Sequence, residues 1–204
     1  MPRDINRKIY LTGAAGAGVT TLGAVLARHY NLPHIDCDTY YWQPTDPPYT
    51  HKRPVAERCA LISARQATGG WVLSGAFDGW GDPLIEDVDL VIYLQTPTPV
   101  RIARIRAREA ERYGARIAPG GDMHGIHRAF TAWAAEYDNP RFAGRNRRRH
   151  EEWLAVQKAP VLRLDGTAPL PALLWQVAQS MMTTLDPSAG LSARIPRREE
   201  TSQV

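Results

Sequence analysis

The sequence predicts an α/β protein built on a doubly wound, five-stranded parallel sheet. Short apolar runs alternate along the chain with segments whose apolar residues recur at helical spacing. The clearest run, residues 89–95, is apolar almost throughout, as expected for a strand that is covered on both faces. A glycine cluster separates the first run, residues 8–12, from a helix that begins at Val19. In such a sheet, ligands bind beyond the carboxyl ends of the strands.

Each element follows from a local pattern. Strands are expected at residues 8–12, 33–36, 71–75, 89–95 and 161–164. Helices are expected from Val19, from Pro54 to about Ala67, from Thr98, after Asp122, from about Asn146 to Lys158, and from Leu170. Proline suits the first turn of a helix, which supports the starts at Pro54 and Pro99, and Asp122 is expected to cap the helix that follows it. Residues 37–53 are rich in Pro, Tyr and Thr and have no period, so we expect a loop there.

The composition is typical of one globular domain with an ordinary core. The chain has 204 residues, of which 44% are hydrophobic. We expect a cytoplasmic protein, because no apolar run approaches the roughly 20 residues of a membrane span and no secretory segment precedes the first strand. Two cysteines are too few for a disulfide framework. We expect residues 1–185 to form one domain and residues 186–204, which are polar and aperiodic, to form a disordered tail.

Positive charge is concentrated in one segment. The chain carries a formal net charge of +4, but the segment from Arg101 to Arg149 holds twelve arginines, no lysine and five acidic residues. That segment is therefore +7 and the rest of the chain is −3. Guanidinium groups match phosphate oxygens bidentately, so the segment indicates that anions are bound here. A nucleic-acid-binding surface would give the same signal.

A glycine- and alanine-rich loop joins the first strand to the first helix. It has the spacing G-x-x-x-x-G-K-[ST], except that Val19 occupies the lysine position. Small residues let consecutive backbone N–H groups surround a phosphate chain, and the start of the helix adds a favourable dipole. The alternative is a strand-to-helix turn that binds nothing. We expect phosphate binding by the whole loop: Gly13, Ala14, Ala15, Gly16, Ala17, Gly18, Val19, Thr20 and Thr21.

The loop and the order of the elements resemble the P-loop NTPases of the small-molecule kinase superfamily, which includes adenylate, shikimate and gluconate kinases. Within it, the chain is most similar to uncharacterised bacterial adenylate kinase-like "AAA family ATPase" proteins, whose loops follow G-A-[SA]-G-[SA]-G-[TV]-T-T-L-G. The resemblance covers Lys8 to Met182. It implies a nucleotide-kinase-like fold with a helical lid at about residues 101–150. It also implies ATP and Mg²⁺ as cofactors and phosphoryl transfer to a small hydroxylated or phosphorylated acceptor.

Two carboxylates follow the second strand. Asp36 and Asp38 are two residues apart, so along a strand they would point the same way. They resemble the D-x-D of shikimate kinase-like enzymes, which implies that Asp36 supports Mg²⁺ and that Asp38 orients or deprotonates the acceptor. Thr20 would offer its hydroxyl to the same metal ion. The alternative is that both aspartates only cap backbone N–H groups.

Aromatic residues and a glycine are candidates for the acceptor site. Tyr41 and Trp42 lie just after the acidic pair, and could form a stacking wall or pack the loop onto the second helix. Gly75 ends the third strand where shikimate kinase-like enzymes have a substrate loop, so it would let an acceptor approach the backbone. Trp80 lies in the glycine-rich stretch that follows, which fits either a pocket lip or a surface turn.

Arginines of the lid region are the expected source of positive charge for the phosphates. In the kinases that the chain resembles, lid arginines close over the phosphates and neutralise charge in the transition state. Arg101, Arg104, Arg108 and Arg112 form a stripe at spacings of three and four. We assign a catalytic role to Arg108 and Arg112 and cofactor binding to Arg116 and Arg145. Gly166 and Thr167 follow the fifth strand, where related kinases hold adenine; an ordinary turn is the alternative.

Two other functions remain open on sequence alone. The protein could bind nucleotide without kinase activity, as an ATPase or a regulator, in which case Val19 marks lost chemistry. It could also bind nucleic acid through its arginine-rich segment. His124 and His127 have a spacing that could bind a metal ion, but no carboxylate completes a site there. The expected partners are a nucleotide and a small-molecule acceptor, with no membrane, in a monomer or homodimer.

Overall fold

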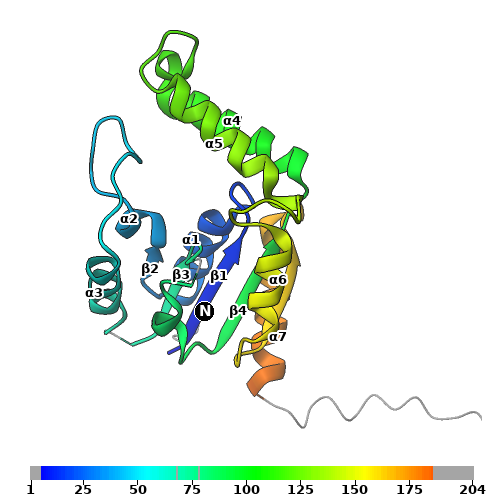
Figure 1. Cartoon of the computed structure of the whole chain (residues 1–204). Helices are drawn as coiled ribbons and strands as arrows, with labels where there is room; N and C mark the ends of the chain where they lie inside the picture. Colours follow the sequence, from blue (N-terminus) through cyan, green and yellow to red (C-terminus); the bar gives the residue numbers. More distant parts are fainter. Residues whose placement is uncertain (1–5, 68, 78, 186–204) are drawn as a thin grey trace, which may run out of the picture.

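The computed structural model describes residues 6–67, 69–77 and 79–185, and the expected tail at residues 186–204 lies outside this range. The described part forms a five-stranded sheet of order β2-β3-β1-β4-β5, in which every neighbouring pair is parallel (Figure 1). The strands are β1 (Lys8–Gly13), β2 (His34–Asp36), β3 (Trp71–Ser74), β4 (Leu90–Gln95) and β5 (Val161–Asp165). The predicted fold class is confirmed.

Helices account for most of the remaining structure. They are α1 (Val19–Tyr30), α2 (Cys37–Tyr41), α3 (Val55–Gln66), η1 (Asp82–Ile85), α4 (Thr98–Tyr113), η2 (Gly114–Ile117), α5 (His124–Ala135), η3 (Glu136–Asp138), α6 (Arg147–Ala155) and α7 (Leu170–Leu185). Over the described ranges, no helix is both long and apolar enough to cross a membrane.

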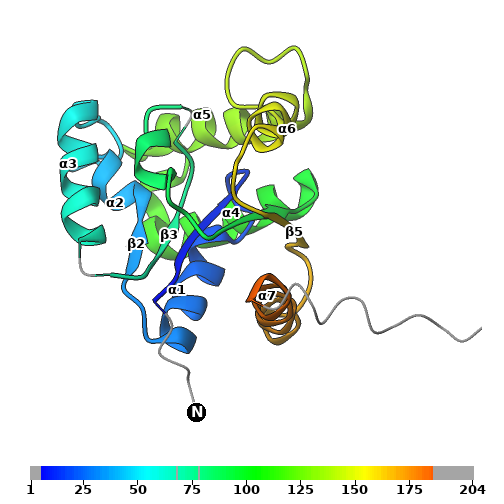
Figure 2. The same cartoon turned by 90° about the horizontal axis from the view of Figure 1, so that it is seen from below.

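Both faces of the sheet are covered, as a parallel sheet requires. On one face α1 and α7 pack over Ile9 and Leu11 of β1. On the other face α3, η1 and α6 pack over Tyr10 of the same strand. Successive residues of a strand point to opposite faces, so β1 contributes to both cores. Figure 2 shows the sheet between these two layers of helices.

The segments beyond the carboxyl ends of the strands are less embedded in these cores. Helices α4 and α5 lie side by side and project past that edge of the sheet (Figure 1). The loop at residues 42–53 projects the same way, and an antiparallel bridge between Trp42 and Lys52 closes its base. Arg116 of η2 donates a hydrogen bond of 2.6 Å to Asp46 of this loop. The loop and the end of α4 are therefore joined by an ion pair.

Three local predictions are wrong. Residues 37–41 form α2 rather than loop, because Asp36 caps it by accepting the Asp38 N–H. Asp122 does not cap α5, whose cap residue is Met123, because its carboxylate is bound by Arg116 instead. Helix α6 is also shorter than expected and ends at Ala155.

Candidate active site

The phosphate loop is built by glycine conformations that other residues rarely adopt. Gly16 has φ +79° and Gly18 has φ +103°. A Cβ on Gly16 would lie 2.6 Å from the carbonyl oxygen of Arg101, so α4 fits against the loop only because this residue is glycine. Gly18 precedes α1 and gives it no side-chain cap. The first amide groups of α1 are therefore left for an anion.

Side chains of α4, and that of Thr96 just after β4, donate hydrogen bonds to carbonyl groups of the loop. Arg101 donates to the Ala15 oxygen at 3.1 Å. The Ala17 oxygen accepts from both Arg104 and the Thr96 hydroxyl, each at 3.1 Å. These bonds engage the Ala15 and Ala17 carbonyls from outside, and the Ala17 N–H donates to the Ala14 carbonyl at 3.0 Å within the loop. The other loop amide groups are of the kind that form a phosphate nest.

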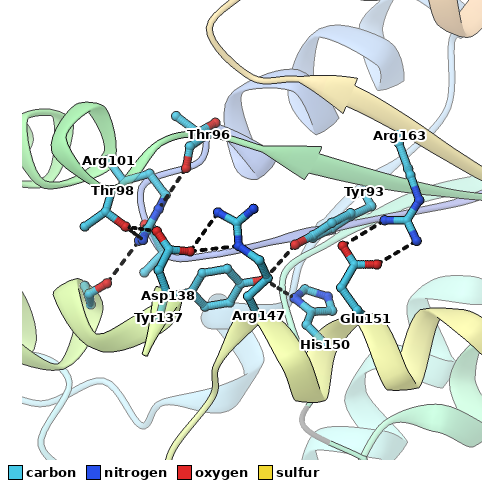
Figure 3. Close-up of polar contacts among 12 residues, drawn as sticks. Tyr93, Thr96, Thr98, Arg101, Tyr137, Asp138, Arg147, His150, Glu151 and Arg163 are labelled. Carbon is cyan, nitrogen blue, oxygen red and sulfur yellow. Dashed lines mark hydrogen bonds and ion pairs between the residues drawn. The ribbon is translucent and has the colours of Figure 1, made fainter. Parts of the chain in front are cut away.

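Arg101 is a structural residue that the sequence pattern did not identify. Its side chain is fully buried, and burial lowers the pKa of its guanidinium. It donates to Thr96 and Thr98 near the start of α4 and to the Ala134 carbonyl of α5 (Figure 3). Its burial sets Arg101 apart from the other arginines of the predicted stripe on α4. Arg101 ties together the phosphate loop, α4 and α5.

Arg104 connects the phosphate loop to the segment after β5. Its second guanidinium nitrogen donates to the Gly166 carbonyl at 3.0 Å. Gly166 must lack a side chain, because a Cβ there would lie 2.1 Å from the Thr96 hydroxyl oxygen. Thr167 turns back onto Asp165 through two hydrogen bonds. The segment predicted to hold adenine is thus fixed relative to the phosphate loop.

Val19 belongs to the hydrophobic core. Its side chain is 9% exposed and packs in the cluster beneath α1 and α7. A Cβ on Gly13 would lie 3.0 Å from a methyl group of Val19, so these two residues depend on each other. The residue that replaces the expected lysine therefore has a packing role of its own.

Thr20 and Asp36, the predicted metal pair, are brought together. The Thr20 hydroxyl and the Asp36 carboxylate are hydrogen-bonded across α1 and β2. Burial raises the pKa of Asp36, and the hydrogen bonds from Asp38 and Thr20, with the charges of Arg112 and Arg108, partly offset this rise. Among the described residues, no group of three His, Cys, Asp or Glu side chains lies close enough together to hold a metal ion. A metal ion here would need oxygen atoms from outside the chain, as is usual for Mg²⁺.

Asp38 lies beside the same group of charges. It is open to solvent, but protein atoms displace much of the surrounding water, and this desolvation raises the pKa of Asp38. The negative charge of Asp36 raises it further, whereas Arg145 and Arg108 lower it. Arg108 therefore acts on both aspartates, and Arg145 acts on Asp38 from another segment.

A cleft of about 380 Å³ opens next to these groups, between β1, the segment after β3, and α6. The described residues that line it are Tyr10, Thr12, Ala76, Phe77, Gly79, Gly144, Arg145, Arg149, His150 and Trp153. Thr12 directly precedes the phosphate loop. The cleft is therefore placed where an acceptor could reach a phosphate on the loop.

The predicted aromatic residues Tyr41, Trp42 and Trp80 are not among the described residues that line this cleft, although Trp80 packs edge-on against Phe77 of its lining with ring centres 5.1 Å apart. Tyr41 and Trp80 pack on Arg58, whose guanidinium carbon lies 3.9 Å and 5.1 Å from their ring centres. Trp42 packs on Tyr41 with ring centres 4.8 Å apart. The space beside Gly75 is filled by Cys37, because an added Cβ would lie 2.4 Å from that of Cys37. The acceptor roles of these residues remain predictions.

Arg116, and the two histidines considered as metal ligands, form contacts with other protein groups. Arg116 is bound by Asp46 and Asp122 at the far end of α4, apart from Asp36 and Asp38. His127 contacts Glu109 at 2.7 Å, and a ring nitrogen of His124 lies 2.9 Å from the Ile117 carbonyl oxygen. The two histidines therefore have separate protein partners.

A buried chain of polar side chains, which no sequence pattern indicated, supports the wall of the cleft. His150 contacts the Thr12 hydroxyl at 3.1 Å through one ring nitrogen and the Tyr137 hydroxyl at 2.8 Å through the other. Tyr137 in turn contacts the Tyr93 hydroxyl at 2.8 Å (Figure 3). Burial, with the charges of Arg145 and Arg163, lowers the pKa of His150 to about 3. His150 is thus neutral at physiological pH and joins α6 to the base of the phosphate loop.

Comparison with models of known protein families finds no match. The uncharacterised protein YqaC of Bacillus subtilis (strain 168) is 38% identical to this chain over 162 residues, which span 79% of this chain and 89% of YqaC. The chain belongs to the family of YqaC.

More distant relatives extend this relationship. A cytidylate kinase of Pyrococcus horikoshii is 30% identical over 122 residues, or 53% of this chain and 60% of that enzyme. A shikimate kinase of Bacteroides fragilis is 58% identical over 33 residues, or 16% of this chain and 18% of that enzyme. The structure of a gluconokinase from Sinorhizobium meliloti 1021 superposes with a TM-score of 0.51 and 14% identity, covering 94% of this chain and all of that one, and shows the same fold. The chain is therefore similar in sequence to a cytidylate kinase over about half of its length, and it shares its fold with a gluconokinase.

Proposed function

We propose that this protein is a kinase that transfers the terminal phosphoryl group of ATP, in the presence of Mg²⁺, to a small hydroxylated or phosphorylated acceptor. One observation carries the proposal: three groups with complementary roles converge at one edge of the sheet. They are the uncapped start of α1, the hydrogen-bonded pair of Thr20 and Asp36, and Asp38, which feels the charge of Arg145 in the cleft lining. Phosphoryl transfer needs mainly positioning and neutralisation of charge. The relatives named as kinases support the same class of reaction.

The chain's own residues fit a nucleotide with its metal ion. The Ala15 and Ala17 carbonyls are bonded to Arg101, Arg104 and Thr96, and the amide groups at the start of α1 would bind phosphate oxygens. The Thr20 hydroxyl and the Asp36 carboxylate supply oxygen atoms of the kind that Mg²⁺ prefers. Bound ATP and Mg²⁺ would provide the phosphoryl group and neutralise its charge. Gly166 and Thr167 would lie against the base.

We assign the charge that Val19 cannot supply to Arg108 and Arg112. Both guanidinium groups act on Asp36, which is bonded to Thr20 at the end of the phosphate loop. Arg101 and Arg104 are less suited to this role, because backbone carbonyls already bind them. Residues 101–150 would then act as a lid that brings Arg108, Arg112 and Arg145 over the phosphates.

Asp38 is the group that would orient the acceptor and take up its proton. It lies near enough to Arg108 and Arg145 for their charges to act on it. A general base contributes about 10²–10⁴-fold to a rate. Asp38→Asn should therefore lower kcat by that factor and leave ATP affinity nearly unchanged. Asp87→Asn is the matched control, because Asp87 is exposed and lies at the opposite end of the sheet, near the start of β1.

The test is ATP consumption by the purified protein with a panel of sugars, nucleosides, nucleotides and hydroxy acids. The expected result is ADP formation that depends on one class of acceptor and on Asp38. Tight ATP binding without turnover on any acceptor would contradict the kinase and favour a nucleotide-binding protein without kinase activity. Steeply salt-dependent binding of nucleic acid instead would indicate a nucleic-acid-binding protein.

A further inference from the structure

We infer that the cleft beside the phosphate loop binds an acceptor that combines an anionic group, either a carboxylate or a phosphate, with a flat ring. The inference rests on the proposed kinase function and names the class of its acceptor. It excludes neutral sugars and polyols as the preferred acceptors. The argument uses the charges, the aromatic side chains and the position of the cleft.

The charged residues that line the cleft within the described part of the chain are both arginines. Both line the cleft: Arg145 lies just before α6, and Arg149 lies in the first turn of that helix. None of the described lining residues is acidic. A carboxylate or phosphate would pair bidentately with the guanidinium group of Arg149, whereas a neutral acceptor would not match its charge.

Arg149 differs from its two neighbours in the chain. Arg147 forms an ion pair with Asp138 at 2.7 Å, and Arg148 forms one with Glu152 at 3.6 Å. Arg149 donates instead to the carbonyl oxygens of Ala143 and Gly144 at 2.8 Å and 3.4 Å. These bonds fix one side of its guanidinium without cancelling its charge, and in the described part of the chain no carboxylate pairs with it. A positioned and uncompensated charge at a cleft is suited to a ligand anion.

Four of the other described residues that line the cleft carry rings: Tyr10, Phe77, His150 and Trp153. Tyr10 stacks on Phe77 with ring centres 5.0 Å apart, and Trp153 meets Tyr10 edge-on at 6.0 Å. The indole N–H of Trp153 donates to Asp82 at 3.2 Å, which fixes its plane. His150 adds another ring whose two nitrogens are already bonded, so it offers the ligand a neutral surface. Rigid aromatic walls with few free polar atoms favour a flat ring over a chain of hydroxyl groups.

The position of the cleft fits transfer to such an acceptor. Thr12 lines it immediately before the phosphate loop, and Arg145 joins it electrostatically to Asp38. With its anion on Arg149, the ligand can direct another oxygen towards Asp38 and the loop. Transfer then forms a bond from that oxygen to the terminal phosphorus of ATP and breaks the bond to the bridging oxygen of ADP. Any proton on the attacking oxygen passes to Asp38.

The test compares ligand pairs that share a ring and differ in charge. The carboxylate arm uses 3-hydroxybenzoate against 3-hydroxybenzamide, and the phosphate arm uses cytidine 5′-monophosphate against cytidine. Dissociation constants are measured by calorimetry with the full chain and saturating ADP. Because a hydrogen-bonded charge pair contributes about 1.5–3 kcal/mol, the anion of at least one pair should bind about 10–100-fold more tightly than its neutral partner.

Arg149→Gln should remove most of this preference, whereas Arg148→Gln, one residue away and paired with Glu152, should keep it. The arm that shows the preference identifies the anion as carboxylate or phosphate. Equal binding of charged and neutral members in both arms overturns the inference, as does an equal loss in both variants. ATP affinity is measured in the same samples. If wild-type protein fails to bind ATP, the proposed function itself is wrong. If ATP binds but the anionic ligands bind no more tightly than their neutral partners, only the acceptor class is wrong.

Discussion

The two halves of α4 use the same residue type for different purposes. In the inner half, Arg101 and Arg104 donate to backbone carbonyls of the phosphate loop and hold its shape. In the outer half, Arg108 and Arg112 project their charge onto Asp36. The four arginines recur at helical spacing and look equivalent in the sequence.

The difference arises from what each half meets. Next to the inner half, the chain turns tightly around Gly16, and its outward carbonyl groups need donors. Next to the outer half lie two carboxylates on β2 and α2. An arginine of α4 is therefore structural where it faces backbone oxygen atoms, and it is a candidate for catalysis where it faces a carboxylate.

Within α4, the largest expected effect is that of Arg108→Gln, which tests the outer half. If Arg108 replaces the missing lysine, its loss should lower kcat about 10²–10³-fold, as for other groups that stabilise transition-state charge. The free energy of unfolding should change little, because Arg108 is partly exposed and its ion pair with Glu109 spans 3.6 Å. Steady-state kinetics and urea unfolding measure the two quantities.

Arg106→Gln is the control for that experiment. Arg106 lies on the same helix and is exposed, and the pKa shifts of Asp36 and Asp38 do not involve it. Its loss should leave kcat within about twofold, as expected for surface substitutions. Equal losses of kcat in the two variants would mean that the outer half acts only through its total charge and that Arg108 has no specific catalytic role.

Arg101→Met tests the inner half and should chiefly affect stability. The variant keeps most of the volume but removes the donors to Ala15, Thr96 and Ala134, leaving buried carbonyl oxygens unpaired. We expect the free energy of unfolding to fall by about 3 kcal/mol. Urea unfolding followed by circular dichroism measures it. A variant as stable as wild type, with kcat strongly reduced, would assign Arg101 to catalysis and abolish the distinction between the halves.

His150→Gln extends the comparison to the cleft wall by means of pH. The folded pKa of His150 is about 3, below its ordinary value of 6.5, so the unfolded chain binds a proton that the folded chain does not. Stability is thus lost as pH falls from 6.5 towards 3. Between pH 7 and pH 5, this residue should cost wild type about 2 kcal/mol. Over the same pH range, the free energy of unfolding of the glutamine variant should fall by about 2 kcal/mol less than that of wild type. Equal losses in unfolding titrations would show that His150 is not held neutral.

The sequence was sufficient for the fold and for bringing Thr20 close to Asp36. Apolar runs and glycine positions are local signals, so the five parallel strands and the loop before α1 were predicted correctly. The pairing of Thr20 with Asp36 also followed, because the carboxyl ends of parallel strands meet at one edge.

Contacts between distant segments could not be predicted in this way. Arg101 is buried because α5 returns over α4, and no spacing in the sequence records that return. His150 meets Thr12 across 138 positions of the chain. Asp122 had the expected type for a helix cap, but Arg116 competed for its carboxylate. Side-chain identity predicts what a residue can do, whereas its partner depends on the tertiary structure.

Val19→Lys should have the smallest effect and bears on both halves at once. The lysine stem can follow the space of Val19, and its ammonium group can extend towards the loop, although a buried methyl group is lost. We expect the ATP dissociation constant to stay within about threefold of wild type or to fall, with a loss of stability of about 1 kcal/mol. If the outer arginines supply the missing charge, the same substitution should partly restore kcat to Arg108→Gln. No restoration, together with a large loss of ATP affinity, would mean that Val19 serves packing alone and that Arg108 does not take the place of the lysine.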